Sequence, residues 1–234
     1  MNEDQEFETY LSLSPKRFCI YLFNTKNSKN VYKNDFEFKI KSEVIDLNHL
    51  KIFIEENIFK IEKLIGKFVK NIFLIIESSE INIIEIGIKK KNYQEYINKK
   101  NLENILFDIK DVFKENYHNN KIMHMIIKRY VVNDNSYFSF QENLLGDHLC
   151  IEVQFRVIPN NLSLEIEKVL EKFQIKIISY VDLIYLKGLF INSNLEISEM
   201  AHKVQNDFNQ NEVKLVPKNN KKLGFFEKFF QLFS

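Results

Sequence analysis

Several residue types that mark particular classes of protein are rare in this sequence. Its 234 residues include no Trp, five Gly, three Pro and two Cys. The two cysteines, Cys19 and Cys150, lie far apart in apolar surroundings, which argues against a disulfide framework or a zinc site and fits a reducing compartment. Because Gly and Pro interrupt regular structure, their scarcity predicts a chain built mostly of helices and strands.

An excess of charge of one sign is missing too. The chain has 33 Lys and Arg against 32 Asp and Glu, and the lysines are scattered among acidic residues. Electrostatics therefore predict no nucleic-acid partner. The acidic start "MNEDQEFETY" lacks the apolar segment of a signal peptide, and no apolar run approaches the ~20 residues that span a bilayer.

Catalytic and nucleotide-binding motifs are also absent. The sequence contains no HExxH, GxGxxG, GxxxxGK[ST] or GxSxG pattern. His148 and Cys150 are two residues apart and point to the same side of a predicted strand, but a metal site there needs two more ligands. We therefore expect no enzyme activity, no catalytic residue, no metal and no cofactor.

Hydrophobic periodicity predicts strand pairs mixed with helices. The first two strands are expected to form one hairpin, and the third and fourth another. This order predicts an α+β fold, with three main helices packed on an antiparallel or mixed sheet, rather than a parallel Rossmann sheet. The predicted strands are 17–23, 31–40, 71–77, 80–91, 121–132, 149–157 and 175–186; the predicted helices are 47–68, 102–113 and 162–173; a polar loop spans about 133–147, and 197–208 is a candidate short helix.

The first predicted helix has the clearest signals. Asp46 is placed to cap its N-terminus. Apolar residues recur at three- and four-residue spacing through Leu47, Leu50, Ile54, Ile58, Ile61, Ile65 and Phe68.

The succession of motifs over 44–190 resembles the subdomain that interrupts the first actin-like lobe of the bacterial division protein FtsA. The family opens this subdomain with Ile-Asp and a long helix, here "IDLNHLKIFIEENIFKIEKLIGKF". A later family strand carries His, Tyr and Asp, here "KIMHMIIKRYVVND" with His124, Tyr130 and Asp134 in register. The first 40 residues fit the family's opening hairpin, which implies a partial actin-like lobe.

The sequence departs from the family at the nucleotide site. The family's hairpin holds glycines that wrap phosphate and an acid that holds magnesium. Here the corresponding stretch "LSLSPKRFCI" contains neither. The second lobe has no counterpart in this chain, which weakens the case for the tubulin-like FtsZ as a partner. The resemblance therefore implies a reduced FtsA without an ATP site.

The last fourteen residues, "KLGFFEKFFQLFS" preceded by Lys221, predict an amphipathic helix that binds anionic lipid headgroups. Five rings fall within an arc of roughly 140°. Burying them partly would yield on the order of 5–10 kcal/mol, but ordering so short a helix offsets much of this. Membrane binding is therefore expected to be reversible for one copy and firmer after self-association or with a membrane-bound partner. The predicted membrane-binding residues are Lys221, Lys222, Leu223, Phe225, Phe226, Lys228, Phe229, Phe230, Leu232 and Phe233.

Two other docking sites for this tail stay open, namely the protein's own sheet and a groove on a partner protein. The predicted domains are an actin-like hairpin (1–43), the FtsA-like subdomain (44–190), a linker (191–220) and the membrane helix (221–234). Strands near 17–40 are candidates for a sheet edge that pairs with another copy.

These observations predict a non-catalytic scaffold at the cytoplasmic face of the inner membrane, at the division site, that organises other division proteins. One alternative is an adaptor of a related membrane machine, such as the PilM-like proteins of pilus systems. A residual nucleotide-binding, actin-like protein is the other.

Overall fold

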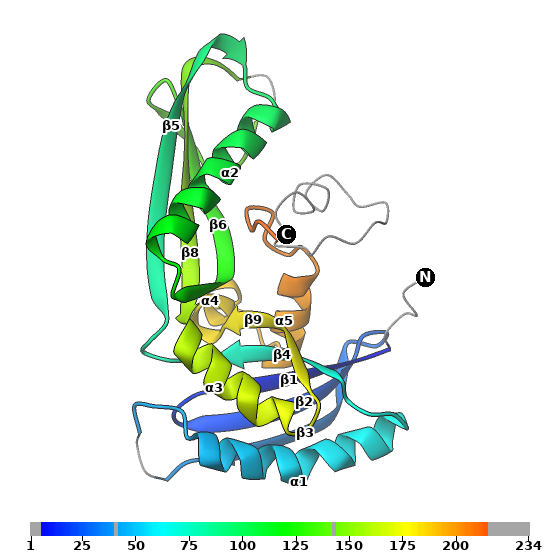
Figure 1. Ribbon diagram of the computed structural model, residues 1–234. Coiled ribbons are helices and arrows are strands. Elements are labelled where there is room, and N and C mark those ends of the chain that lie inside the picture. Colours follow the sequence, from blue (N-terminus) through cyan, green and yellow to red (C-terminus); the bar gives the residue numbers. More distant parts are fainter. Residues whose placement is uncertain (1–5, 40–41, 142–143, 215–234) are drawn as a thin grey trace. The chain divides into compact units, whose positions relative to one another are not determined.

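The computed structural model describes residues 6–39, 42–141 and 144–214, which divide into two compact units (Figure 1). Unit 1 comprises Met1–Asn82 and Ile158–Phe208, and unit 2 comprises Ile83–Val157 and Asn209–Ser234. The chain thus completes part of unit 1, builds unit 2 and then returns to unit 1.

Within the described residues, this interleaved division does not follow the boundaries expected between 1–43, 44–190 and 191–220, whereas the expected membrane helix (221–234) lies outside those residues. Residues on both sides of position 43 share one sheet, because β1 (Phe7–Leu13) pairs in parallel with β4 (Asn71–Ile76), which pairs in parallel with β9 (Lys176–Asp182). Pairing between strands so distant in sequence leaves no local signal in a periodicity pattern.

The sheet of unit 1 is mixed and five-stranded, in the order β3-β2-β1-β4-β9. β2 (Arg17–Asn24) pairs antiparallel with both β1 and β3 (Lys29–Glu37), which confirms the first predicted hairpin. Every residue of β2 from Phe18 to Asn24 is buried, so helices cover both faces of this strand. β1 was not predicted, although its sequence "FETYLSL" has strand-forming residues.

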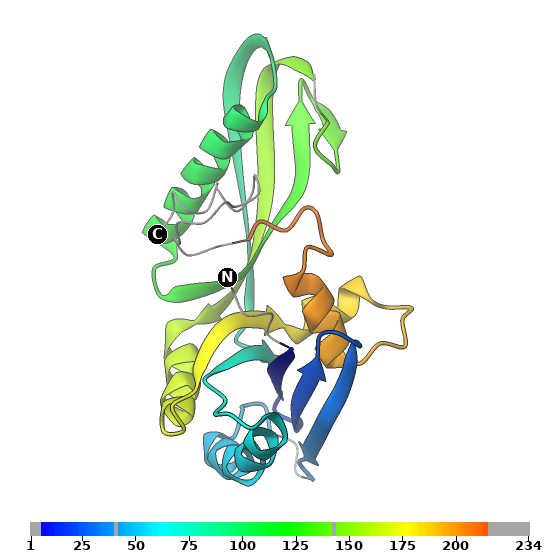
Figure 2. The same ribbon diagram turned by 90° about the vertical axis from the view of Figure 1, so that its right-hand side faces the viewer.

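Four helices belong to unit 1. α1 (Leu47–Ile65) and α3 (Asn160–Glu171) contact each other and lie on one face of the sheet, whereas α4 (Leu183–Leu189) and α5 (Ile197–Gln205) lie on the other (Figure 2). The short helix expected near 197–208 is therefore confirmed as α5.

The ends of α1 follow from its capping residues. The Asp46 carboxylate accepts hydrogen bonds from the backbone N–H groups of Asn48 and His49, which confirms the predicted N-cap. Gly66 ends the helix in the left-handed conformation, with φ of 68°. Phe68 was expected on the buried face, but it follows this cap and its side chain is 78% exposed.

In the described part of unit 2, one helix packs on a four-stranded sheet. Its sheet order is β5-β8-β6-β7. The second predicted helix packs on this sheet and not on that of unit 1, so the three main helices are shared between two sheets. The elements are β5 (Asn82–Tyr96), α2 (Lys99–Asn116), β6 (Asn120–Val132), β7 (Asn135–Tyr137) and β8 (Leu145–Pro159), and their core includes Leu106, Ile109, Phe113, Met125, Ile127, Ile151, Val153 and Phe155.

Two predictions were wrong because apolar runs do not identify their partners. The stretches 71–77 and 80–91 were expected to form a hairpin, but β4 joins the sheet of unit 1 and β5 joins that of unit 2. The run 175–186 was expected to be one strand, but β9 ends at Asp182, whose carboxylate caps α4 by accepting from the N–H of Ile184. A short apolar run can be a buried strand or a buried helix.

The segment after α5 extends the sheet of unit 2. The N–H of Ile127 donates to the Asn211 carbonyl (2.9 Å), and the N–H of Val213 donates to the Met125 carbonyl (2.7 Å). These bonds form an antiparallel bridge between Ile126 and Glu212. Part of the stretch expected to be a linker (191–220) therefore pairs with β6.

Candidate interaction surface

The predicted membrane-binding residues of 221–234 all lie outside the described residues, so the tail stays a prediction. Within the described ranges, no helix combines the length and apolar character needed to cross a bilayer.

The turn between β1 and β2, which the resemblance led us to compare with a phosphate loop, is closed by its own side chain. Ser14 Oγ accepts from the N–H groups of Lys16 (3.3 Å) and Arg17 (3.0 Å) and donates to the Arg17 carbonyl (3.1 Å). A phosphate-binding turn presents such N–H groups to the ligand. Here two of them are engaged within the turn.

Two clusters of titratable side chains could suggest chemistry, but both are explained by packing. In unit 1, Glu8 Oε2 accepts from the Tyr10 hydroxyl (2.5 Å) and lies 2.7 Å from His202 Nδ1. Burial, together with the charge of Glu8, raises the pKa of the Tyr10 phenol well above its usual value. Tyr10 is fully buried, so its hydroxyl cannot reach a substrate.

The second cluster, on β8, contains the pair singled out in the sequence. His148 and Cys150 do lie on the same side of the strand, opposite the core residues Leu149 and Ile151. Burial raises the pKa of the Cys150 thiol, which disfavours the thiolate. Within the described part of the chain, no group of three His, Cys, Asp or Glu side chains is placed to hold a metal.

One end of unit 2 is held by a set of hydrogen bonds and presents aromatic side chains to solvent. Its frame is held by asparagines at the point where β5 ends, α2 begins and β8 begins. Buried Asn92 donates to the Gly146 carbonyl (3.0 Å) and accepts from Asn101 Nδ2 (3.3 Å). Asn98 caps α2 through a reciprocal capping box with Asn101. The N–H of Ile97 donates to the Leu144 carbonyl (2.8 Å).

The neighbouring β6–β7 turn is tied into the same end. Asn133 and Asp134 both have positive φ, 47° and 69°, as a two-residue type I′ hairpin requires. Asn133 Oδ1 accepts from the N–H groups of Asp147 (2.9 Å) and His148 (3.2 Å) on β8. Only a polar loop was predicted here, although Asn and Asp are among the residues that favour such a turn.

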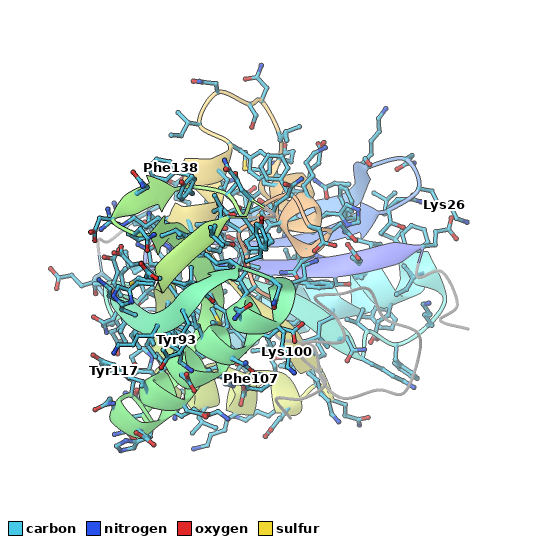
Figure 3. All side chains as sticks on the ribbon, turned by 90° about the horizontal axis from the view of Figure 1, so that it is seen from above. Lys26, Tyr93, Lys100, Phe107, Tyr117 and Phe138 are labelled. Carbon is cyan, nitrogen blue, oxygen red and sulfur yellow. The ribbon has the colours of Figure 1, made fainter. Side chains whose placement is uncertain are left out.

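This frame exposes three large side chains, which we call the tip surface: Tyr93, Tyr96 and Leu145. Their exposed fractions are 78%, 63% and 55%. Tyr93 also has left-handed backbone, with φ of 50°, which costs a bulky residue about 1 kcal/mol. Phe138, 75% exposed, follows β7 at the other edge of the sheet and lies apart from Tyr93 (Figure 3).

Positive charge adjoins the tip surface along β5. Lys89 and Lys91 alternate with Lys90 toward the end of β5, and both are exposed. Lys90 points the other way and pairs with Asp108 on α2. Tyrosine is enriched in surfaces that bind another protein, whereas lysine is depleted there and suits the polar rim of such a surface.

No protein-family model matches the sequence, and no curated protein has significant similarity to it. Solved structures with weak likeness to its fold include the three described here. A PilM–PilN type IV pilus biogenesis complex aligns with a TM-score of 0.49 and 7% identity, over 76% of this chain and 48% of that chain.

The other two are similar in extent. The cytoplasmic domain of EpsL, an inner-membrane component of the type II secretion system of Vibrio cholerae, aligns with a TM-score of 0.36 and 8% identity, over 76% of this chain and 57% of that chain. A protein from Bacteroides thetaiotaomicron with an actin-like ATPase fold and unknown function aligns with a TM-score of 0.34 and 12% identity, over 82% of this chain and 59% of that chain. The chain thus spans between 48% and 59% of these structures.

Proposed function

We propose that this chain is a non-catalytic adaptor that links a protein partner to a membrane. The tip surface of unit 2 binds the partner, and the amphipathic tail holds the adaptor to anionic lipid. The observation that carries the proposal is the exposure of Tyr93, Tyr96 and Leu145 on a frame held by Asn92. Tyrosines that a rigid frame keeps in solvent add little to the core, and their exposure indicates a role in binding another protein.

The closed β1–β2 turn supports the non-catalytic part of the proposal. A residual nucleotide-binding protein would need the N–H groups of Lys16 and Arg17 for phosphate, and Ser14 Oγ accepts from both. The reduced actin-like character of the chain belongs to the same proposal.

Two membrane machines are candidates. The motif succession in 44–190 favours cell division, with FtsA-like recruitment at the division site. The names of the similar structures point to pilus or secretion systems, and we place this candidate first. Localisation in the cell is the measurement that distinguishes them.

The test follows a fluorescent fusion of the full chain in its own cells. We expect foci at the membrane; mid-cell bands would identify division and other envelope foci a pilus or secretion machine. Removing 221–234 should make the signal diffuse. The double variant Tyr93→Ser/Tyr96→Ser should stay at the membrane but spread evenly, because the partner no longer concentrates it.

The matched control is Phe138→Ser, which removes an equally exposed ring from the other edge of the sheet. It should leave the foci unchanged. Foci that persist in the double tyrosine variant would contradict the role of the tip surface. Membrane signal that persists without 221–234 would contradict the tether.

A further inference from the structure

β3 is the outermost strand of the sheet of unit 1. It pairs with β2 on one side, and the described residues place no strand on its other side. An open edge of this kind presents unpaired N–H and C=O groups to another strand. The two side-chain faces of β3 indicate which strand fits there.

The α1 side of β3 is held rigidly. Asn57 on α1 is fully buried, and its Oδ1 accepts from the Tyr32 hydroxyl (2.6 Å) and from Asn34 Nδ2 (2.7 Å). Phe36 stacks on the His49 ring, with ring centroids 6.0 Å apart. Despite this contact, Phe36 remains 43% exposed. The aromatic side chains on this face are therefore fixed in place and partly open to solvent.

The opposite face of β3 carries charges that alternate in sign. Lys33 Nζ bonds both carboxylate oxygens of Glu196 (2.9 and 2.8 Å), and Asp35 pairs with Arg17 on β2 (2.9 Å). Lys33 and Asp35 lie two positions apart on one face and have opposite charge, so the strand is complementary to itself when run in the opposite direction.

We propose that β3 pairs antiparallel with β3 of a second copy, with Asn34 on the two-fold axis. In this register Lys33 of each copy lies opposite Asp35 of the other. Tyr32 of each copy lies opposite Phe36 of the other, on the α1 side. The interface then contains two cross-strand ion pairs and two aromatic pairs, and the two five-stranded sheets join edge to edge.

Each neighbouring two-fold register contains a like-charge contact on its axis. Shifting the axis to Lys33 places Lys33 opposite its own copy. Shifting it to Asp35 places two Asp35 carboxylates face to face, although Lys33 then lies opposite Glu37, so the covalent test below is needed to fix the register. Val31 sets a further limit, because it is an extra residue in β3 without a partner on β2. Such a bulge bends the strand, so regular pairing is confined to the stretch from Tyr32 to Glu37.

Sedimentation equilibrium of the full chain over a range of concentrations tests the pairing. The native chain should show a monomer–dimer equilibrium that weakens at high salt. Lys33→Asp creates two like-charge contacts, so its dissociation constant should rise at least about tenfold. Asp35→Lys should have a similar effect. The swap Lys33→Asp/Asp35→Lys should restore the dimer.

Lys176→Glu, on the strand at the other edge of the same sheet, is the matched control and should leave the constant unchanged. A native chain that is monomeric at every concentration overturns the proposal. So does a dimer that tolerates Lys33→Asp, or one that the charge swap does not restore.

A covalent test reports the register without depending on the charges. Directly opposite residues of an antiparallel pair have Cα atoms about 4.5–5.5 Å apart, within the range of a disulfide. Asn34→Cys should therefore form a disulfide-linked dimer under mild oxidation, whereas Lys176→Cys should not. Equal cross-linking of the two variants, or none for Asn34→Cys, overturns the proposed axis.

Discussion

A β-carbon on residue 146 would lie 2.4 Å from Cγ1 of Val132, so the start of β8 approaches β6 more closely than any residue but glycine allows. Gly146 also accepts the hydrogen bond from Asn92 that ties the tip surface. Gly146→Ala should therefore lower the free energy of unfolding by about 1–3 kcal/mol, as overpacking does. Urea denaturation measures the change.

Gly188→Ala is the control for that substitution. Gly188 lies in α4, and a β-carbon there would meet no atom within 4 Å. Alanine in a helix is favoured over glycine, so this variant should be unchanged or slightly more stable. Equal destabilisation by both variants would contradict the steric explanation.

Asn57 joins α1 to the open edge strand. It accepts from Tyr32 and Asn34 and donates to the Phe53 carbonyl (2.7 Å). Asn57→Leu removes these three hydrogen bonds from a fully buried site. The substitution should therefore lower the free energy of unfolding by about 2–3 kcal/mol. Thermal unfolding followed by circular dichroism checks this. Glu56→Leu changes the neighbouring exposed side chain and should have little effect.

Lys110 predicts a pH dependence of stability. Burial on α2, aided by the charge of Lys114, lowers the pKa of its ammonium from 10.5 to about 8. Unfolding therefore takes up a proton between these values, and the free energy of unfolding should rise as pH rises from about 8. Lys110→Met should remove this rise and raise stability at neutral pH by on the order of 2 kcal/mol.

Denaturant titrations between pH 7 and ~9.5 measure the effect before tyrosines ionise in the unfolded chain. Above that range the slope should reverse, because burial raises the pKa of Tyr130 to about 12 and the folded state resists its ionisation. A slope that is unchanged in Lys110→Met would refute the assignment to this side chain.

The pairing of 209–213 with β6 depends on a buried side-chain contact. His124 Nδ1 lies 2.6 Å from Glu212 Oε1, and the two side chains are 1% and 12% exposed. Glu212→Ala removes this contact, so the segment should detach more often. Hydrogen exchange at the N–H groups of Ile127 and Val213 should accelerate, because both bonds join this segment to β6. Exchange at the N–H of Val153 in the core should change less.

The sequence was a good guide wherever a local rule decides the structure. Asp46 predicted its helix start because a carboxylate satisfies the first free N–H groups wherever the helix lies. The alternation in 149–157 likewise predicted which side of β8 faces the core, since side chains in a strand alternate.

The pairing of strands that are distant in sequence could not be predicted from the sequence. β4 and β5 are adjacent in sequence and both apolar, yet they joined different sheets, and only the pairing of β4 with β1 and β9 decides this. The tip surface was missed for a related reason. Tyr93 and Tyr96 look like ordinary strand residues until the asparagine bonds around Asn92 show which residues remain outside.

The return of the chain to unit 1 has a kinetic consequence. β9 can complete its sheet only after the whole of β5 to β8 has been synthesised. Until then, the edge of β4 that will pair with β9 stays unpaired. If unit 2 folds first, it shortens the effective loop between β4 and β9 and lowers the entropy cost of closing it. Nascent chains halted before β9 should therefore expose the unpaired edge of β4, and we expect a ribosome-bound chaperone to bind there.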